Sequence, residues 1–553
     1  MMVPDVCPVT TTGVLRKAAF TAPDVEAVVC GTDRITFSHL AEHVDAIKRG
    51  LLNLGVAAGD HVAVCVGNGS RWVELFYAIT GVGAVVIPVN TRYRGEEMRH
   101  VLEQSQTRFL FTATKFLSSD FRGLLREIAP ALDDQLPDAG LPNLRRVVFT
   151  DGDEVPRGAM SWQDFLNAPD RPERPPTPQS VRESATEPEP GPGPSPDDVA
   201  LIQYTSGTTS RPKGVLLTHR SMCLDAYFSG TRMGLRLGDR FHSVRPFFHV
   251  AGSTLSVLAS AQCLSTLVTM PRFEPGPALE VLEAERCTHF SGNDTIALML
   301  LSHPDRSHRR LVLRGAWVAA APAIVRRVID ELGAREAVVG YGLSEAAPNV
   351  AQSAWYEGRE LRVSGAMLPE PGVSVRIWDL VDDELCATGE HGEIQVRGWN
   401  VMQGYFDEPE QTARAFTPDG WLKTGDIGVG DESGRIQFVG RAKDLIRVGG
   451  ENVAPAEIED VLHRHHDVKQ AVVVGVPDER LVEVPFAFVV LNDRCVCSEI
   501  ELRDWVKARI SGFKVPRYVR IVQGFEQIGM TASSKIQKNK LAAYAVSVLD
   551  VAS

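Results

Sequence analysis

The chain has 553 residues, of which 44% are hydrophobic and 23% charged, values typical of a soluble globular protein too long for one hydrophobic core. Its net charge of −12 argues against broad binding to nucleic acid or to an anionic membrane, because both favour a basic protein surface. Any phosphate ligand must therefore be held by local groups.

Cysteine usage and the first residues indicate the compartment. The nine cysteines are scattered, without a Cys-x-x-Cys pair, which is typical of free thiols in a reducing cytosol. The N-terminus lacks a basic region followed by an apolar run, so no signal peptide is expected. The most apolar window, residues 72–89, contains Glu74 and Pro88 and makes a poor membrane span. We expect a cytoplasmic protein without an integral span.

The first third of the chain alternates between helical and strand patterns. Apolar residues at helical spacing predict a helix over 37–54, closed by Gly55. The pattern then predicts strands at 61–66, 84–87 and 108–111 and helices at 71–80 and 96–104. Such alternation predicts an α/β fold, a parallel sheet with helices on both faces.

A proline-rich stretch divides this half from a second one. Residues 171–198 contain nine prolines and are expected to form an extended surface linker. A second α/β subdomain follows, with helices expected at 276–285 and 322–332 and strands at 311–318 and 337–340. Residues 373–440 are rich in strand and turn signals, which predicts a β subdomain.

From about residue 442 the pattern begins again. A helix is expected at 456–466, strands at 470–476, 484–491 and 518–522, and a further helix that starts at a capping box formed by Ser498 and Glu501. We therefore predict a small C-terminal α+β domain of about a hundred residues, a size consistent with independent folding.

The stretch Tyr204-Thr-Ser-Gly-Thr-Thr-Ser-Arg-Pro-Lys-Gly214 lies between two apolar runs that predict strands, 199–202 and 215–217. Its hydroxyls and Lys213 can donate to an anion, and Gly207 and Gly214 allow positive φ and close backbone approach. It is not a Walker A loop, because the order is Lys-Gly and a strand follows. The residues predict a polyphosphate-binding loop; a glycine-rich hairpin without function is the alternative.

Five motifs together make the chain resemble the adenylate-forming superfamily of acyl-CoA synthetases, luciferases and adenylation enzymes. The resemblance covers nearly the whole length, with the motifs in the expected order. The motifs are Thr205-Ser-Gly-Thr-Thr-Ser-Arg-Pro-Lys-Gly214, Tyr341-Gly-Leu-Ser-Glu345, Thr424-Gly-Asp426, Gly440-Arg-Ala-Lys-Asp444, and Thr531-Ala-Ser-Ser-Lys-Ile536.

The resemblance implies a nucleotide site built from these motifs. It implies that Tyr341 stacks on adenine, that Ser344 contacts phosphate, that Glu345 coordinates Mg²⁺ and that Asp426 accepts hydrogen bonds from both ribose hydroxyls. A tyrosine packed on the core is the alternative for Tyr341. The other residues implied to contact the nucleotide are Thr205, Ser206, Gly207, Thr208, Thr209, Lys213, Ala320, Ala321 and Arg441.

The resemblance also assigns residues to a moving C-terminal domain. It places a hinge at Asp444, a turn along the pantetheine tunnel at Gly449 and Gly450, and a lysine that contacts both the carboxylate and the α-phosphate at Lys535. The alternatives are a plain hairpin turn for the glycines and a solvated basic tail for the lysine. Serine stands at 210 and 534, where the family commonly has glycine, and both departures reduce backbone freedom.

The acid is expected to bind beside His249, which matches a family histidine at the floor of the acyl pocket; a satisfied core histidine is the competing interpretation. The candidate lining residues are small and uncharged, which favours a bulky hydrophobic acid. They are Val250, Ala251, Gly292, Asn293, Ala316 and Gly340.

We therefore expect an AMP-forming acid:CoA ligase with ATP, Mg²⁺ and coenzyme A. Catalysis is assigned to Lys535, Glu345 and His249, in a large domain (1–440), a hinge (441–444) and a mobile domain (445–553). Transfer to an acyl carrier protein, luciferase-like oxidation, a nucleotide-binding protein without catalysis, and homodimerisation all remain open.

Overall fold

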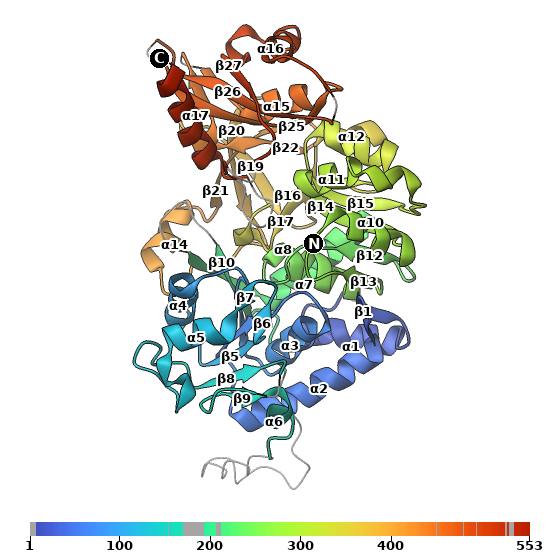
Figure 1. The fold of residues 1–553 in the computed structure, drawn as a ribbon, viewed down its shortest axis with the longest axis vertical. Helices are drawn as coiled ribbons and strands as arrows, with labels where there is room; N and C mark the ends of the chain where they lie inside the picture. Colours follow the sequence, from blue (N-terminus) through green and yellow to red (C-terminus); the bar gives the residue numbers. More distant parts are fainter. Residues whose placement is uncertain are drawn as a thin grey trace.

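The computed structural model describes residues 7–152, 154–169, 193–205, 212–449, 451–478, 480–493, 495–525, 528–529 and 536–552. These residues form four sheets of four or more strands and one two-stranded ribbon, β6 (Lys115–Phe116) with β7 (Ser119–Asp120). Figure 1 shows the N-terminal sheet at one end of the molecule and the C-terminal residues, in orange to red, at the other.

The first large sheet has seven strands. All its pairs are parallel except the antiparallel hairpin of β10 and β11 at one edge. Helices α4 (Gly95–Gln104) and α5 (Phe121–Ile128) cover one face and share an apolar core with it. In sheet order, the strands are β11 (Lys213–Thr218), β10 (Val199–Thr205), β4 (Val85–Pro88), β3 (His61–Cys65), β5 (Phe109–Thr112), β8 (Arg146–Phe149) and β9 (Met160–Ser161).

The second large sheet has nine strands, parallel in the centre and antiparallel at both edges. Helices α10 (Pro275–Ala284), α11 (Asp294–Leu301) and α12 (Pro322–Glu331) cover its outer face. In sheet order, the strands are β18 (Leu368–Pro369), β17 (Asn349–Gln352), β16 (Val338–Gly342), β15 (Gly315–Ala319), β14 (His289–Asn293), β12 (Arg240–Ser243), β13 (Thr266–Thr269), β1 (Glu26–Cys30) and β2 (Asp33–Thr36).

The largest apolar core lies between the two large sheets. It joins Phe111 of the seven-stranded sheet and Trp317 of the nine-stranded sheet to Trp72 of a central helix. These large side chains are buried, so the two sheets and the helices between them fold as one body. The helices that contribute to this core are α1 (Thr11–Thr21), α2 (Phe37–Leu54), α3 (Ser70–Gly81), α6 (Trp162–Leu166), α7 (His219–Met233), and the run α8 (Val250–Gly252), a π-helix (Ser253–Leu258) and α9 (Ala259–Gln262).

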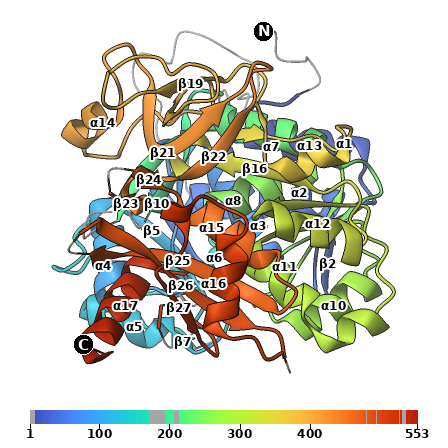
Figure 2. The same ribbon diagram turned by 90° about the horizontal axis from the view of Figure 1, so that it is seen from above.

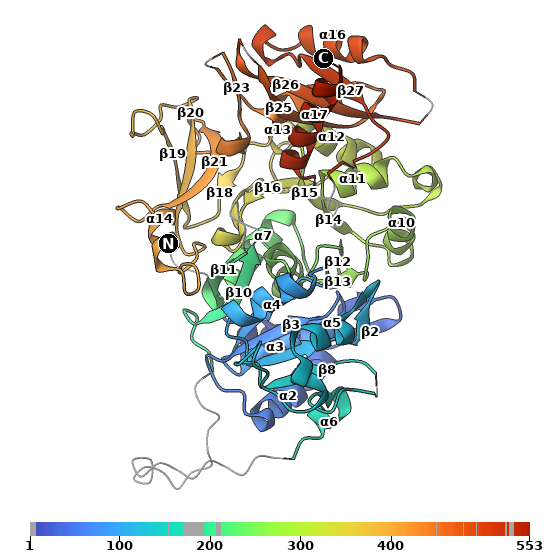
Figure 3. The same cartoon turned by 60° about the vertical axis from the view of Figure 1, so that its left-hand side comes forward.

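An antiparallel four-stranded sheet lies beside the nine-stranded sheet, as Figure 3 shows. Met367 and Ile436 exchange backbone hydrogen bonds of 2.8 Å across the junction. The strands are β19 (Ser374–Trp378), β20 (His391–Arg397), β21 (Leu422–Gly430) and β22 (Ile436–Arg441), and the nearby helices are α13 (Arg359–Ser364) and α14 (Pro409–Ala415).

The C-terminal residues form a five-stranded sheet with helices on both faces, drawn in orange to red at the front of Figure 2. The predicted capping box is confirmed: Ser498 Oγ accepts from Glu501 N (3.2 Å) and Glu501 Oε2 accepts from Ser498 N (2.8 Å). The elements are β23 (Ile446–Val448), β24 (Glu451–Val453), β25 (Val468–Asp478), β26 (Val482–Leu491), β27 (Tyr518–Ile521), α15 (Pro455–His463), α16 (Glu499–Lys507) and α17 (Lys538–Ala552).

The predicted α/β class, with a large N-terminal part and a small α+β part, is confirmed. Three local predictions are wrong. The strand predicted from 311 begins at Gly315; Arg314 before it forms ion pairs with Asp239 and Glu336. The helix predicted to 466 ends at His463.

The third correction concerns Gly214. It is an ordinary strand residue that pairs with Tyr204, so it does not supply the positive φ that we expected. Its missing Cβ still matters, because a Cβ there would come within 2.7 Å of Ile202 Cγ2.

All nine cysteines are free and none is exposed. The pKa of every thiol is raised, and burial is the main cause at eight of them. At Cys495 the main cause is its hydrogen bond with Asp467. Within the described residues, no helix has the length and apolar character needed to cross a bilayer.

Glu370 is a buried carboxyl group that follows β18. Complete burial raises its pKa to about 7, and Arg232, 3.4 Å away, only partly opposes this effect. Because the folded-state pKa lies above the unfolded value near 4.5, the associated stability is present at acid pH and is lost as pH rises between these two values.

We therefore expect Glu370→Gln to raise the melting temperature at pH 8. At this pH the wild type buries a charged carboxylate, which lowers the free energy of unfolding by about 3 kcal/mol. Little change is expected near pH 4.5. Arg232 keeps its other acceptors in the variant, the carbonyl oxygens of Gln352, Leu368 and Pro369. Thermal unfolding at both pH values checks this; an equal change at both would contradict it.

Gly342 ends β16 where that strand meets β17. A Cβ at this position would overlap the backbone carbonyl oxygen of Pro348, which cannot move without breaking the β16–β17 pairing. We expect Gly342→Ala to destabilise the protein by about 3 kcal/mol. The control is Gly358→Ala, because a Cβ at Gly358 meets nothing within 4 Å. Equal melting temperatures for the two ligand-free variants would contradict the prediction.

Candidate functional site

The predicted phosphate loop connects β10 to β11. Thr205 and Lys213 face one another as the last pair of this antiparallel hairpin, so both ends of the loop are fixed by the seven-stranded sheet. Ser206, Gly207, Thr208 and Thr209 lie outside the described residues. Lys213 Nζ donates to Gln411 Oε1 and lies 5.2 Å from the centre of the Tyr405 ring.

Tyr341 and Asp426 meet where β16 approaches the four-stranded sheet. Both side chains are buried, and Tyr341 Oη donates to Asp426 Oδ2 at 2.9 Å. The Tyr341 ring stacks on Phe438, with centroids 5.4 Å apart and planes at 19°. The Tyr341 side chain thus belongs to the outer apolar core, one face of its ring is covered by the exposed Phe438, and its hydroxyl donates to the aspartate.

Asp426 sits in a group of charged side chains. Arg441 Nε lies 3.5 Å from Asp426 Oδ1, and Arg441 is half-exposed. Burial raises the pKa of Asp426, and the carboxylates of Glu345 and Asp444 raise it further, while Arg441 and the Tyr341 hydroxyl lower it. The aspartate therefore has neighbours of both signs and two donors that hold it in place.

Glu345 lies in the short 3₁₀ helix Ser344–Ala346, directly after β16. Its Oε1 accepts a hydrogen bond of 2.9 Å from Tyr405 Oη, and its backbone carbonyl accepts from Met402 N at 2.9 Å. Ser344 beside it is half-buried. A partly exposed carboxylate in a fixed orientation fits Mg²⁺, which prefers hard oxygen ligands.

The small-residue turn follows β15. Ala320 and Ala321 are half-buried, and Pro322 begins α12. Ala323 N in the first turn of α12 donates to Asp460 Oδ1 of α15 at 3.2 Å. This hydrogen bond joins the large part of the chain to the C-terminal sheet domain, and no ion pair between described residues crosses that boundary.

The candidate acyl-pocket residues divide between the two faces of the nine-stranded sheet. His249 is exposed and caps the helical turn that follows it, where Nδ1 accepts from Ala251 N at 3.2 Å. A buried core histidine is therefore ruled out. Val250 is buried and Ala251 half-buried. Asn293 caps α11 through a 2.9 Å bond from Ile296 N.

Strand alternation separates the remaining candidates. Gly340 lies under Trp317 on the inner face, where an added Cβ would come within 2.5 Å of the Trp317 ring. Ala316 belongs instead to the outer core beneath α10–α12, and a Cβ on Gly292 would meet Ile296 of α11. Ala316 and Gly292 therefore do not share a face with Gly340, because neighbouring residues of a strand point to opposite sides.

The predicted hinge lies between the four-stranded sheet and the C-terminal sheet. Asp444 ends a 3₁₀ helix over Ala442–Asp444, between β22 and β23. Gly449 is exposed, adopts φ of 60° and donates its N–H to the Leu481 carbonyl at 2.8 Å. Gly450 and Lys535 lie outside the described residues.

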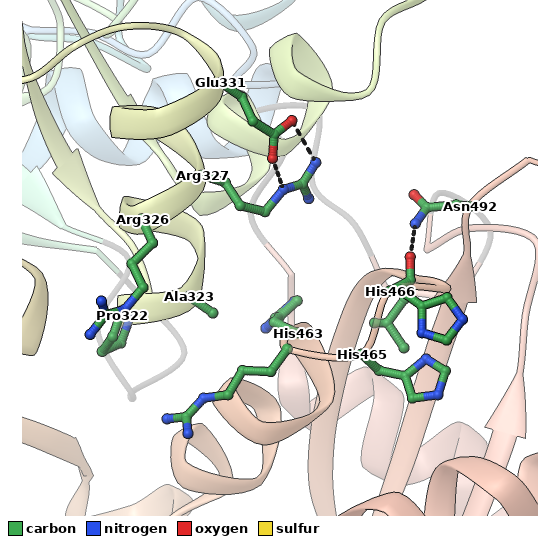
Figure 4. Close-up of a pocket in the computed structure, with 11 residues that line it drawn as sticks. Pro322, Ala323, Arg326, Arg327, Glu331, His463, His465, His466 and Asn492 are labelled. Atoms are coloured by element: carbon green, nitrogen blue, oxygen red, sulfur yellow. Dashed lines mark hydrogen bonds and ion pairs between the residues drawn. The ribbon is translucent and has the colours of Figure 1, made fainter.

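A cleft of about 710 Å³ separates α12 from the end of α15 (Figure 4). Its arginines are already paired with carboxylates: Arg327 with Glu331, Arg326 with Glu360 and Arg464 with Asp460. The cleft therefore offers little uncompensated charge to an anion, and we place the chemistry at the Tyr341–Asp426–Glu345 group instead.

Several site residues carry no motif that could have identified them in the sequence. Tyr405, in a loop, donates to Glu345, and Gln411 of α14 accepts from Lys213. Phe438 of β22 stacks on Tyr341. Trp317 lies in an apolar run that predicts only a buried strand, with no sign of a ligand site.

Comparison with known proteins gives the family. The AMP-binding enzyme family matches residues 15–406, and the AMP-binding enzyme C-terminal domain matches residues 457–535. The 3-[(3aS,4S,7aS)-7a-methyl-1,5-dioxo-octahydro-1H-inden-4-yl]propanoyl:CoA ligase of Rhodococcus jostii is 35% identical over 97% of this chain and 98% of its own. The mitochondrial medium-chain acyl-CoA ligase of Danio rerio is 32% identical over 94% and 85%.

Solved structures agree with this fold. The anthranilate CoA ligase AuaEII, in complex with anthranoyl-AMP, has a TM-score of 0.83 at 23% identity over 98% of this chain and 99% of its own. The o-succinylbenzoate CoA synthetase of Bacillus subtilis, with its acyl-adenylate, has a TM-score of 0.74 at 26% identity over 96% and 97%. The chain therefore belongs to the AMP-binding enzyme family and, as one of its acyl-CoA synthetases, uses ATP, Mg²⁺ and coenzyme A.

Proposed function

We propose that this enzyme activates a bulky hydrophobic carboxylic acid as its acyl-adenylate and then transfers the acyl group to the thiol of coenzyme A. The observation that carries the proposal is the meeting of Tyr341, Asp426, Arg441 and Glu345 at the carboxyl end of β16, the usual ligand side of a parallel sheet. The β16 end supplies Tyr341 and Glu345, and the β21–β22 pair, 85 positions further along the chain at Asp426, supplies Asp426 and Arg441.

The nucleotide is proposed to bind across this group. Asp426 accepts from the ribose hydroxyls, Arg441 and the loop that ends at Lys213 face the phosphates, and the turn Ala320–Ala321 lies along adenine beside Tyr341. Glu345 would hold Mg²⁺, which neutralises phosphate charge when bound. Its hydrogen bond from Tyr405 keeps one carboxylate oxygen in a fixed position.

Two reactions share the site. In the first, a carboxylate oxygen of the acid attacks the α-phosphorus and the bond to pyrophosphate breaks, with the ammonium of Lys535 offsetting the repulsion between the two anions. In the second, the CoA sulfur attacks the acyl carbon, the bond to AMP breaks and the thiol proton is released. His249, which is exposed next to Val250 and Ala251, is proposed to lie beside the reacting acid.

The same lobe is proposed to serve both reactions by turning about residues 441–444. The sparse contact between residues 1–440 and 445–553 supports this, because the Ala323–Asp460 hydrogen bond is readily broken and no described ion pair opposes rotation. Rotation would withdraw Lys535 and bring Gly449 and Gly450 toward the incoming thiol.

The acid class rests on the small, uncharged residues that remain candidates for the inner face, Val250, Ala251 and Gly340, and on the relatives. The Rhodococcus jostii ligase is named for a bicyclic propanoyl substrate and the Danio rerio enzyme for medium-chain acids.

A panel of aryl, fatty and polycyclic acids, measured by acid-dependent pyrophosphate release, tests the proposal. We expect the hydrophobic polycyclic and longer fatty acids to have the highest kcat/KM. Silence across the whole panel would favour a nucleotide-binding protein without catalysis; thioester formed only with a carrier protein would exclude CoA as acceptor.

Lys535→Ala is expected to lower acyl-adenylate formation by about 10²-fold or more, because a charge that stabilises the transition state is removed. Thioester formation from supplied acyl-adenylate and CoA should be spared. The matched control is Lys540→Ala, an exposed lysine of the same basic stretch, which should leave both half-reactions unchanged. If both half-reactions of Lys535→Ala fell equally, the proposed role would be lost.

A further inference from the structure

Arg245 is a buried arginine just beyond the end of β12. Arg245 is only 9% exposed, and its guanidinium carbon lies 4.0 Å from the centre of the Trp317 ring. The backbone around it is fixed, since Asn68 Nδ2 donates to the Arg245 carbonyl at 2.9 Å and Phe247 N donates to Asn68 Oδ1 at 2.9 Å.

Both terminal nitrogens of Arg245 lack a hydrogen-bond partner among the described residues. Burial lowers the pKa of the guanidinium to about 9, which leaves it charged at neutral pH, and no carboxylate of the described residues raises it again. An unpaired buried charge is strongly unfavourable. The other buried arginine among the described residues, Arg362, is matched: it donates to the backbone carbonyl oxygens of Glu357, Ala337 and Arg335.

The surroundings of Arg245 belong to the inner face of the nine-stranded sheet. Ser291 pairs with Trp317 in the β14–β15 register, so both point to this face, and the buried Ser291 Oγ also lacks a partner among the described residues. The Trp317 ring packs directly on Gly340, where a Cβ would come within 2.5 Å of the ring, and this contact fixes the ring that Arg245 covers. A forked cation and a hydroxyl, both unpartnered, face the same side of the sheet.

The guanidinium of Arg245 lies next to the proposed reacting site but further into the protein interior, beside Trp317. Phe248, three residues after Arg245, accepts a hydrogen bond of 3.2 Å from Gln203 Nε2 of the strand that leads to the phosphate loop. Trp317 lies two residues, roughly 7 Å, before the end of β15, where the turn Ala320–Ala321 follows. An acid whose carboxyl group meets the nucleotide at the strand ends would extend its far end toward Arg245.

We propose that Arg245 is a specificity-determining residue that, with Ser291, binds an oxygen acceptor at the end of the acid remote from the reacting carboxyl group. The inference rests on the proposed function and narrows its substrate class from a plain hydrophobic acid to one with a second carboxylate or a ketone. A guanidinium suits either group, because its planar N–H fork donates two parallel hydrogen bonds.

The test compares matched straight-chain acids of six to twelve carbons, each as the plain acid, the terminal methyl ketone and the dicarboxylic acid. The wild type should prefer an oxygenated member by about tenfold or more in kcat/KM. Arg245→Met should lose about 10- to 100-fold on that acid and little on the plain acid of equal length. The wild-type preference between ketone and dicarboxylate identifies the acceptor. No wild-type preference, or an equal loss on all acids, would overturn the proposal.

Thermal unfolding of the ligand-free protein provides a readout that does not need activity. Arg245→Met should melt at the same temperature as the wild type or higher, because it removes a buried charge without a partner. The control Arg435→Met breaks an ion pair and should melt lower with unchanged acid preference. If Arg245→Met melted as low as Arg435→Met, Arg245 would be structural. If no acid were adenylated, the proposed function would fail, and this comparison would still decide the role of Arg245.

Discussion

The carboxylate of Asp426 connects the parts of the molecule on which the site depends. It belongs to β21 of the four-stranded sheet, accepts from Tyr341 of the nine-stranded sheet, and is balanced by Arg441 at the entrance to the C-terminal domain. Burial alone would favour its neutral form, so the two donors are needed to hold it as an acceptor. The hydrogen bond between Tyr341 and Asp426 thereby links β16 to β21.

The sequence predicted the layers well because they follow from local periodicity. The alternation of strands and helices, the β-rich segment and the renewed α+β pattern after 442 all reflect apolar spacing, and the capping box at Ser498 is encoded within four residues. The backbone conformation at Gly214 was harder to predict. Glycine suggested a turn, whereas in the structure Gly214 is a strand residue whose small size is needed for its contact with Ile202.

The site was only partly predictable, for a physical reason. Motifs place Tyr341 and Asp426 at strand ends, but their hydrogen bond joins residues 85 positions apart and depends on how two sheets meet. The orientation of Ala316 and Gly292 could not be predicted, because it depends on which face of β14 and β15 is turned toward the seven-stranded sheet. Arg245 was overlooked because burial of a charge is a property of the tertiary environment, not of the neighbouring sequence.

The protonated state of the nine cysteines has a consequence for an enzyme that handles a reactive mixed anhydride. A thiol reacts through its thiolate, and in this protein every thiol is held in the neutral form, five of them buried. Few thiolates of the chain are thus available to capture an activated acyl group. The fold thereby disfavours acylation of its own cysteines, which would compete with the sulfur of the soluble acceptor.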